Sequence, residues 1–501
     1  MTDEQELGIT VSKDQNMSDW YTQVVKKAEL ADYAPVKGCM VIRPYAMDIW
    51  DRLKDVFDDW IEDEVDNAYF PLFIPESYLE KEKDIVEGFD PEVAWVENAG
   101  QDEELEERLA VRPTSESIIA PFMADWIRSH RDLPFRLNQW CNVVRWEATD
   151  TRPFLRTREF LWQEGHTAHK DEESATEEVM KRLDQYARLY EDYLAIPVLK
   201  GRKPEHDKFP GAIVTTTVES LMPDGKSIQG GTSHNLGTNF AEAFDIEYED
   251  RNQEKQYCYT CSWGLSTRAL GALIMAHGDD DGLVLPPEVA PTQVVIVPIY
   301  QEDNRDEVLV YADEVADRLD GFRVEVDDRD YKTPGFKFNE HELRGVPLRL
   351  EIGPNEVEDQ VVTAARRDDG SQEELALDGI DAAVEELLED IQVALYERLK
   401  DYRDDHIAEA DSYEKILELI GRQRGYVKAP WCGDEACEAE VKDQVHAEIV
   451  MVPFEDEDPI SGSSGSTRSE GSVQDEQEEL TGSCAICDKD AEFTAYFAKN
   501  Y

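Results

Sequence analysis

Basic side chains are scarce in this chain. It has 501 residues, of which 51 are Lys or Arg and 112 are Asp or Glu, so its formal net charge is −61. Strongly acidic chains are often disordered, but 41% hydrophobic residues and 10 Trp predict folded domains with cores. Mutual repulsion of this size needs screening, and the Debye length falls to about 3 Å in molar salt. The composition therefore predicts a folded protein from a high-salt cytoplasm, a halophilic protein.

Long hydrophobic runs are also missing. No apolar run approaches the roughly 18 to 20 residues that cross a membrane as a helix. Residues 1–19 are polar and acidic, unlike a secretory signal peptide, and the chain contains no polybasic run. We therefore expect a cytoplasmic protein with no membrane and no DNA partner. The length of the chain predicts two to four domains.

Cysteine is sparse, with 8 residues, and the last four form two close pairs. Cys432 and Cys437 make the first pair, and Cys484 and Cys487 make the second. In a large chain without a secretion signal, such pairs favour metal binding over disulfides. Four thiolates complete a tetrahedral zinc site with no open position, so we predict a structural zinc ion, with free thiols as the alternative. The acidic segment 455–480 between the pairs predicts a disordered loop.

The first 285 residues alternate amphipathic helices with short strands. Hydrophobic spacing predicts helices over residues 18–34, 46–65, 117–131 and 172–194, and strands over 40–44, 69–75, 215–219 and 257–263. Pro71 lies inside the second of these strands, which predicts an edge strand or an interface strand. Thr114-Ser115-Glu116, ahead of the third helix, is by itself typical of a helix cap. Cys258 and Cys261 fall in the last strand, where we predict two core thiols rather than a second metal site.

The pattern of hydrophobic residues changes at Thr292. Continuous apolar runs now alternate with helical spacing, which predicts a small α/β domain with a largely parallel or mixed sheet. One expected strand begins at residue 294, and two others cover 322–326 and 348–352. The expected helices cover 305–319, 335–343 and 380–402.

Residues 137–146 and 159–166 are two apolar-patterned runs around a polar turn, the pattern of an antiparallel hairpin. Four arginines crowd into this hairpin: Arg145, Arg152, Arg156 and Arg158. A solvated hairpin with surface ion pairs is the plainer interpretation. Because arginine binds phosphate through a planar fork and the rest of the chain is so acidic, we favour a polyanion site. Arg268 agrees with it, since it falls in the first turn of an expected helix, where the dipole disfavours a cation without an anion to bind.

Three segments together resemble motifs 1, 2 and 3 of class II aminoacyl-tRNA synthetases: Pro71 after a long helix, Arg145-Trp146-Glu147 opening the hairpin, and residues 264–268 (Gly-Leu-Ser-Thr-Arg) opening a helix. Thr114-Ser115-Glu116, residues 154–166 and residues 229–234 (Gln-Gly-Gly-Thr-Ser-His) further resemble prolyl-tRNA synthetases of the archaeal and eukaryotic type. The likeness runs over nearly the whole chain.

The resemblance implies a multidomain α/β and α+β protein with three domains. A class II catalytic domain built on an antiparallel sheet would span residues 1–285, and an α/β anticodon-binding domain would span 286–403. A small zinc-binding α/β domain, containing the acidic loop, would span 404–501. A homodimer through the first motif is also implied.

The activity that the resemblance implies is ligation of proline to tRNA(Pro), with ATP and magnesium. The carboxylate of L-proline would attack the α-phosphate of ATP, and the prolyl group would then pass to the 3′ end of the tRNA. Positioned cations would stabilise the charge that spreads over the phosphate oxygens. Arg145 and Arg268 would be the catalytic residues, which bind the phosphates from opposite sides.

Other residues take their roles from the same resemblance. Proline would be bound by Thr114, Glu116, Arg145, Trp162, Glu164, Phe209 and His234. ATP would be bound by Arg145, Glu147, Arg156, Gln229, Thr232, Ser266 and Arg268. The tRNA anticodon would meet Lys337, Glu340 and Arg344, and the terminal Tyr501 would pack towards the active site.

Two rival interpretations remain open on the sequence alone. One is a class II synthetase for another small amino acid, above all threonine, whose catalytic pocket would hold zinc through a Cys and two His. Glu116, Trp162 and His234 at the corresponding places disfavour it. The other rival is a synthetase-like tRNA-binding protein without catalysis, which would have no use for Arg145 and Arg268 as an ATP clamp.

Overall fold

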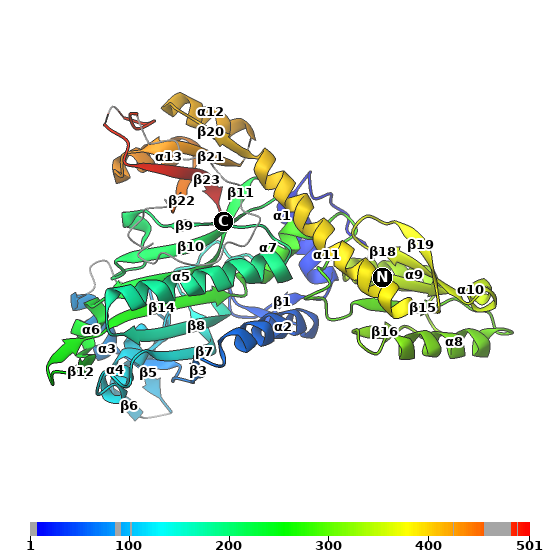
Figure 1. Ribbon diagram of the computed structural model, residues 1–501, viewed down its shortest axis with the longest axis horizontal. Coiled ribbons are helices and arrows are strands. Elements are labelled where there is room, and N and C mark those ends of the chain that lie inside the picture. Colours follow the sequence, from blue (N-terminus) through cyan, green and yellow to red (C-terminus); the bar gives the residue numbers. More distant parts are fainter. Residues whose placement is uncertain (1–7, 86–91, 101–102, 424, 455–481, 488) are drawn as a thin grey trace. The chain divides into compact units, whose positions relative to one another are not determined.

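The computed structural model describes residues 8–85, 92–100, 103–423, 425–454, 482–487 and 489–501 (Figure 1). The predicted disordered loop 455–480 lies outside these residues. The chain divides into two compact units: a larger one of residues 58–188, 198–269 and 403–501, and a smaller one of residues 1–57, 189–197 and 270–402. Within the described residues, no helix has the length and apolar character needed to cross a membrane.

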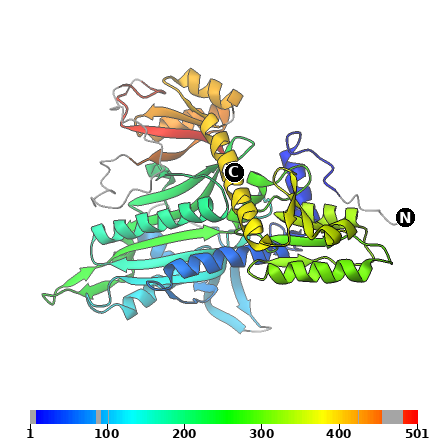
Figure 2. The ribbon, with the colours of Figure 1, turned by 45° about the vertical axis from the view of Figure 1, so that its right-hand side comes forward.

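An eleven-stranded sheet dominates the larger unit, and most of its neighbouring strands are antiparallel. In spatial order its strands are β20 (Ile407–Glu409), β21 (Tyr426–Trp431), β23 (Phe493–Asn500), β22 (Glu448–Pro453), β9 (Leu199–Arg202), β10 (Val214–Leu221), β11 (Lys226–Gly237), β14 (Tyr259–Ser266), β8 (Glu159–His169), β7 (Phe135–Val144) and β3 (Asp66–Asn67). Helix α5 (Glu172–Arg188) crosses one face of the central strands (Figures 1 and 2). The opposite face is left for a site.

The predicted arginine-rich hairpin is confirmed as β7 and β8. Their register runs from Phe135 opposite Ala168 to Val144 opposite Glu159, and the loop between the strands carries the arginines. Gly165 lets β8 and β14 pack closely, because a Cβ atom there would stand 2.1 Å from the ring of Trp263.

A three-stranded sheet, β4 (Phe73–Pro75), β6 (Glu103–Val111) and β5 (Trp95–Ala99), accompanies helices α3 (Glu76–Ile85), α4 (Glu116–Trp126) and α6 (Asn239–Phe244). The strand predicted over 69–75 begins only at Phe73, so Pro71 precedes it, although β4 is the edge strand that the sequence predicted. Helix α4 ends five residues earlier than predicted. Ile127 is extended there, and the carboxylate of Asp132 accepts from the amides of Arg128 and Ser129 in a tight turn.

From Ile407 onwards, the described residues form a module of β20 to β23 with helices α12 (Tyr413–Gln423) and α13 (Glu435–Val445). Its strands continue the main sheet, because β22 pairs with β9 at Val452 opposite Arg202. Strand β23 also pairs in parallel with the start of β11, at Lys226 opposite Lys499. No break in the sheet marks the predicted boundary at residue 404.

The smaller unit contains a mixed five-stranded sheet, as the alternation after Thr292 predicted. Its order is β16 (Val324–Val326), β15 (Val294–Pro298), β17 (Leu348–Ile352), β18 (Val361–Arg366) and β19 (Gln372–Ala376). Helices α8 (Arg305–Arg318), α9 (Pro334–Leu343), α10 (Pro354–Asp359) and α11 (Ile380–Asp405) accompany it. All five residues of β15 are buried, which explains its uninterrupted apolar sequence.

The N-terminal helix α1 (Met17–Lys27) is shorter than the predicted 18–34. Its expected apolar face is confirmed, since Trp20, Val24 and Ala28 are fully buried. The helix cannot continue because Glu29 has a φ of 61°. A two-stranded hairpin follows, β1 (Ala31–Tyr33) with β2 (Met40–Ile42), and then the long helix α2 (Pro44–Ile61).

Candidate active site

Two adjoining cavities lie on the face of the main sheet, with volumes of about 320 Å³ and about 170 Å³. They share four lining residues: Arg145, Phe160, Ser266 and Arg268. Every residue that the sequence predicted for proline or ATP lines one of them. The larger is lined by Thr114, Glu116, Trp162, Glu164, Phe209, Gln229, Thr232 and His234 besides the shared arginines and serine, and the smaller by Glu147 and Arg156.

Strand register gathers these side chains. Across the sheet Trp162 stands opposite Ser266, and Glu164 stands opposite Gly264, which in turn faces Thr232. The next row joins His166, Ser262 and His234 in the same way. Because alternate residues of a strand share a face, all these positions belong to the same face of the sheet. Gly264, which has no side chain, leaves room in the middle of that face.

Thr114 and Glu116 enter from the start of α4. The hydroxyl of Thr114 donates to the carboxylate of Glu116, and both side chains are buried. The plainer interpretation of Thr-Ser-Glu as a helix cap is wrong, because Ser115, at the N-cap position, makes no side-chain capping bond. Its hydroxyl instead donates to Glu164. Residues 114–116 therefore use their side chains to form and support the cavity.

Glu164 is the most tightly held group of the site. Its carboxylate accepts from Ser115, from Gln139 Nε2 at 2.8 Å and from the thiol of Cys141 at 3.2 Å, and it meets His166 Nε2 at 3.0 Å. Burial alone would raise the pKa of Glu164, but these donors outweigh it and hold the pKa below its usual range. Burial opposes the charged form of His166, yet Glu164 raises its pKa. Each of the two groups therefore favours the charged form of the other.

Three of the aromatic rings that line the larger cavity belong to His234, Phe209 and Trp162. His234 and Phe209 stack with ring centroids 4.8 Å apart, and the hydroxyl of Thr215 meets His234 Nδ1 at 3.0 Å. Enclosure, with the charges of Arg145 and His166, lowers the pKa of His234 to about 3, so the imidazole is neutral at neutral pH. Trp162 completes the wall, and its indole N–H donates to Cys141 Sγ at 3.2 Å.

Arg145 stands where the two cavities meet. Its guanidinium lies 5.5 Å from the ring centroid of Phe160 and 5.7 Å from that of Trp162. Enclosure lowers the pKa of Arg145, against the opposing attraction of Glu147, Glu116 and Glu164, but arginine stays charged. Arg268, the first residue of α7 (Arg268–His277), is held by a bond from its Nε to the carbonyl of Leu155 at 3.1 Å.

Several residues of the site have no role that sequence patterns predict. His166 and Phe160 line the cavity within a segment that was already quoted, but periodicity gives them no role. Ser115, Gln139 and Cys141 contact Glu164. Ser115 does so from the start of α4, and the pairing of β7 with β8 brings the other two to it. Gln139 stands opposite Glu164 in that register, and Cys141 stands opposite Trp162.

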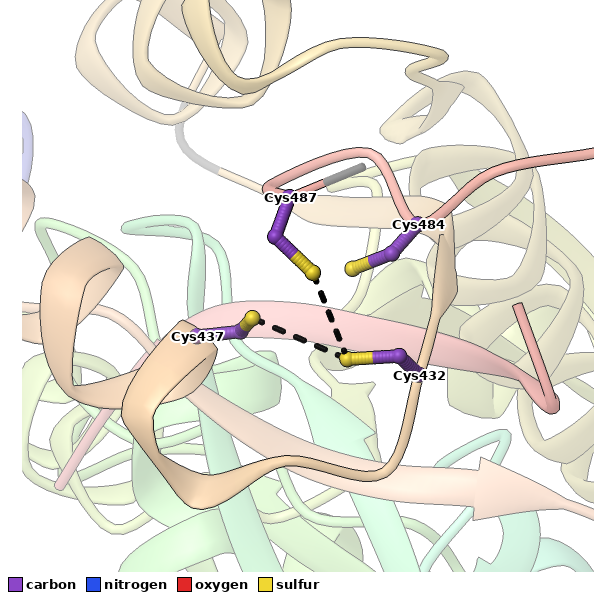
Figure 3. A group of neighbouring side chains, drawn as sticks. All are labelled: Cys432, Cys437, Cys484 and Cys487. Atoms are coloured by element: carbon purple, nitrogen blue, oxygen red, sulfur yellow. Dashed lines mark hydrogen bonds between the residues drawn. The ribbon is translucent and has the colours of Figure 1, made fainter. Parts of the chain in front are cut away.

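The four paired cysteines converge as the sequence predicted (Figure 3). Their sulfur atoms all lie within 4.8 Å of one another, and Cys432 Sγ is 3.7 Å from Cys437 Sγ and 3.6 Å from Cys487 Sγ. Zinc–sulfur bonds of about 2.3 Å in a tetrahedron place sulfurs about 3.8 Å apart. The donor set and spacing therefore fit zinc. Cys258 and Cys261 are buried elsewhere in this unit, as core thiols.

The predicted anticodon residues have different surroundings. Lys337 is 2% exposed, and its ammonium donates to the carbonyl of Asp327 at 2.6 Å, so it is fixed in the interior and not presented to a partner. Glu340 contacts Arg329, and Arg344 pairs with Glu29 at 2.9 Å. Both keep partly exposed side chains.

The terminal Tyr501, which is expected to pack towards the active site, does not line either cavity. Its hydroxyl contacts Asp224, and its ring lies 4.3 Å from Lys226 Nζ. Asp224 lies in the turn between β10 and β11, and Lys226 is the first residue of β11. The C-terminus therefore holds the beginning of β11, three residues before Gln229.

An antiparallel sheet whose open face carries two linked cavities, with an arginine at their junction and another at the start of the following helix, is the core of a class II aminoacyl-tRNA synthetase. Residues 95–277 match the model of the tRNA synthetase class II core domain (G, H, P, S and T), residues 293–387 that of an anticodon binding domain, and residues 413–501 that of the prolyl-tRNA synthetase C-terminal domain.

Similar proteins of known name show to which family of class II synthetases the chain belongs. Proline--tRNA ligases of Halorubrum lacusprofundi and Haloarcula marismortui are each 61% identical to the chain, over 100% of it and 99% and 100% of their own lengths. A crystal structure of prolyl-tRNA synthetase from Cryptosporidium parvum, complexed with halofuginone and AMPPNP, is 42% identical with a TM-score of 0.89, over 99% of this chain and 100% of that one. The chain belongs to the proline--tRNA ligases. This decides against a threonine enzyme and against a non-catalytic binder.

Proposed function

We propose that the chain activates L-proline with ATP to prolyl-adenylate and transfers the prolyl group to the 3′ end of tRNA(Pro). The observation that carries the proposal is the larger cavity, which combines a small aromatic enclosure with buried carboxylates and opens past Arg145 into a second cavity. We assign catalysis to residues 1–285, anticodon binding to 286–403 and a structural role to 404–501.

Proline brings a small apolar ring and a secondary ammonium. Trp162, Phe209 and the neutral ring of His234 would enclose the pyrrolidine, because they form the apolar wall. Glu116, with Thr114 bonded to it, would accept from the ammonium, since it is a buried carboxylate at the cavity surface. Glu164 would add negative charge behind the ammonium.

The reaction needs positive charge where the two substrates meet. Arg145, which lines both cavities, would hold the proline carboxylate and the α-phosphate together for attack. Arg268 would hold the outer phosphates, and magnesium, when bound, would neutralise part of their charge. Glu147, Arg156, Gln229, Thr232 and Ser266 would orient the nucleotide. Proline oxygen attacks phosphorus and pyrophosphate leaves, with no covalent enzyme intermediate.

Several further assignments complete the proposal. The thiolates of Cys432, Cys437, Cys484 and Cys487 would hold a structural zinc ion. Glu340 and Arg344 are the candidates for anticodon contact, and the enclosed Lys337 would support α9 behind them. We further propose a homodimer through the first motif, a cytoplasmic location and adaptation to high salt; the relatives from halophilic archaea support the last point.

The test is amino-acid-dependent ATP–pyrophosphate exchange in multimolar KCl, with all twenty amino acids assayed separately. Exchange with proline far above the rest is the expected result. Strong exchange with a different amino acid would overturn the assignment of the pocket. No exchange from protein shown to be folded would overturn the proposed catalysis.

A further inference from the structure

The segment between β9 and β10 links the amino-acid cavity to a different part of the larger unit. It begins with the short 3-10 turn η2 (Glu205–Asp207). Residues 207–210 line the larger cavity. Within it Phe209 stacks on His234, and its amide donates to the hydroxyl of Thr215 at 2.9 Å. The position of one cavity wall therefore depends on what holds this segment.

The other side of the segment contacts the C-terminal module. His206 Nε2 lies in direct contact with Glu438 Oε2 on α13. Glu438 is 6% exposed, and its other oxygen accepts from the amide of Ile449 in β22 at 2.8 Å. A carboxylate fixed between a helix and a strand is a rigid anchor, because it cannot follow the loop if the loop moves. His206 itself keeps 25% of its side chain exposed.

A second group of contacts ties the same module to the neighbouring strands. The buried hydroxyl of Tyr426, from β21, lies 3.1 Å from Ser227 Oγ, which donates to Glu219 at 2.8 Å. Lys203 then bridges Glu219, at 3.2 Å, and Asp207, at 3.4 Å. The module thus contacts the cavity segment directly through Glu438 and indirectly through this polar chain.

We propose that His206 is a positioning residue for the amino-acid pocket: its contact with Glu438 holds residues 205–210 so that Phe209 stands against His234. The fit of the pocket to its amino acid then depends on the C-terminal module. The inference rests on the proposed role of Phe209 in binding proline. The two cavities should respond differently, because the smaller one is lined by residues of the β7–β8 hairpin, by Ser266 and by Arg268, and none of its lining comes from 205–210.

The proposal predicts that KM for proline changes while KM for ATP does not. His206→Ala in the full chain should raise KM for proline about tenfold in ATP–pyrophosphate exchange, while KM for ATP stays within about twofold. Since His206 is partly at the surface, its loss opens no core cavity, and the thermal midpoint should stay close to that of the parent. His206→Gln, which keeps a donor of similar length, should restore much of the affinity.

Glu438→Gln tests the other partner, and it keeps an acceptor for the Ile449 amide. It should reproduce the rise in KM for proline, and the double variant should be no worse than either single one, since both remove the same contact. Lys442→Ala is the matched control on α13. It removes a 2.6 Å ion pair with Glu448 and should leave both KM values unchanged.

The proposed role of the His206–Glu438 contact is wrong if both single variants keep the parental KM for proline. It is also wrong if KM for ATP and the thermal midpoint change together with KM for proline. Additive effects in the double variant would also contradict it. Absence of proline-dependent ATP–pyrophosphate exchange in the parent protein is a different result, because it overturns the proposed function and not only the role of the His206–Glu438 contact.

Discussion

At the scale of single residues, the site is held by groups that do not face the substrates. Glu164 keeps its charge in a buried place because four neighbours contact its carboxylate, and His166 is one of them. Trp162 is fixed by a bond from its indole to the thiol of Cys141. The residues that would touch proline therefore have few alternative positions, which is the preorganisation that selective binding requires.

Arg145→Lys tests the role of the guanidinium fork at the junction of the cavities. Lysine keeps the charge but loses the planar pair of donors, so we expect kcat for pyrophosphate exchange to fall roughly 10²- to 10³-fold. Arg158→Lys is the control, since Arg158 belongs to the same hairpin but lines neither cavity. Equal losses in both variants would mean that the hairpin needs arginine for folding and not for the reaction.

Buried neutral histidines make stability fall in mild acid. Burial, together with Arg398 and Lys13, lowers the pKa of His277 to about 3, although its bond to the carbonyl of Leu194 opposes the shift. The unfolded chain takes up this proton near pH 6.5, whereas the native protein does not, so lower pH favours unfolding. From about pH 7.5 to about pH 5.5, His277 should cost about 1.4 kcal/mol of unfolding free energy.

Urea unfolding of the parent and of His277→Gln at the two pH values, in high salt, measures this effect. The variant should lose about 1.4 kcal/mol less than the parent over the interval. An equal loss in both proteins would show that His277 is protonated in the native state, contrary to the direction of its pKa shift.

At the scale of elements, strand β23 explains why the C-terminal residues are aromatic. It pairs with β21 and β22 on its two sides and touches β11 at its end. Phe497 is fully buried between these neighbours, and Tyr496 is 7% exposed. The strand therefore couples the cysteine-rich module to the sheet of the active site.

Removal of one clustered thiol should release the module. In Cys484→Ser we expect zinc content to fall from about one per chain to near zero and the thermal midpoint to fall by several degrees, because three thiolates no longer close a tetrahedral site. Metal analysis and a thermal melt in high salt measure both changes. Cys258→Ser, which alters a buried thiol outside the cluster, should keep its zinc. A parent protein without zinc would contradict the assignment.

At the scale of the whole molecule, the charge of −61 sets the conditions for folding. Circular dichroism in multimolar KCl should show a cooperative thermal transition, and transfer to dilute buffer should lower the midpoint or unfold the chain, because unscreened carboxylates repel. Potassium chloride and sodium chloride at equal ionic strength should act alike if screening is the cause. A midpoint that does not change with salt would remove the argument for adaptation to high salt.

The sequence by itself determined the main parts of this protein. Hairpin β7–β8, the α/β domain after Thr292 and the four-cysteine cluster follow from local patterns, since periodicity and spacing are properties of neighbouring residues. Every residue that its motifs named for proline or ATP lines one of the two cavities. It failed where local signals conflict with packing: the N-terminal helix ends at Lys27 and α4 ends at Trp126.

Only the tertiary structure decided which distant residues meet. Ser115 reaches Glu164 from the start of α4, and His206 reaches Glu438 on α13, by contacts that no local pattern specifies. Gln139 and Cys141 of β7 reach Glu164 across the pairing with β8. A shift of one residue in a strand would send these side chains to the opposite face. The residue types of the site can therefore be recognised from the sequence, whereas the contacts that hold these residues in place arise from strand register and burial.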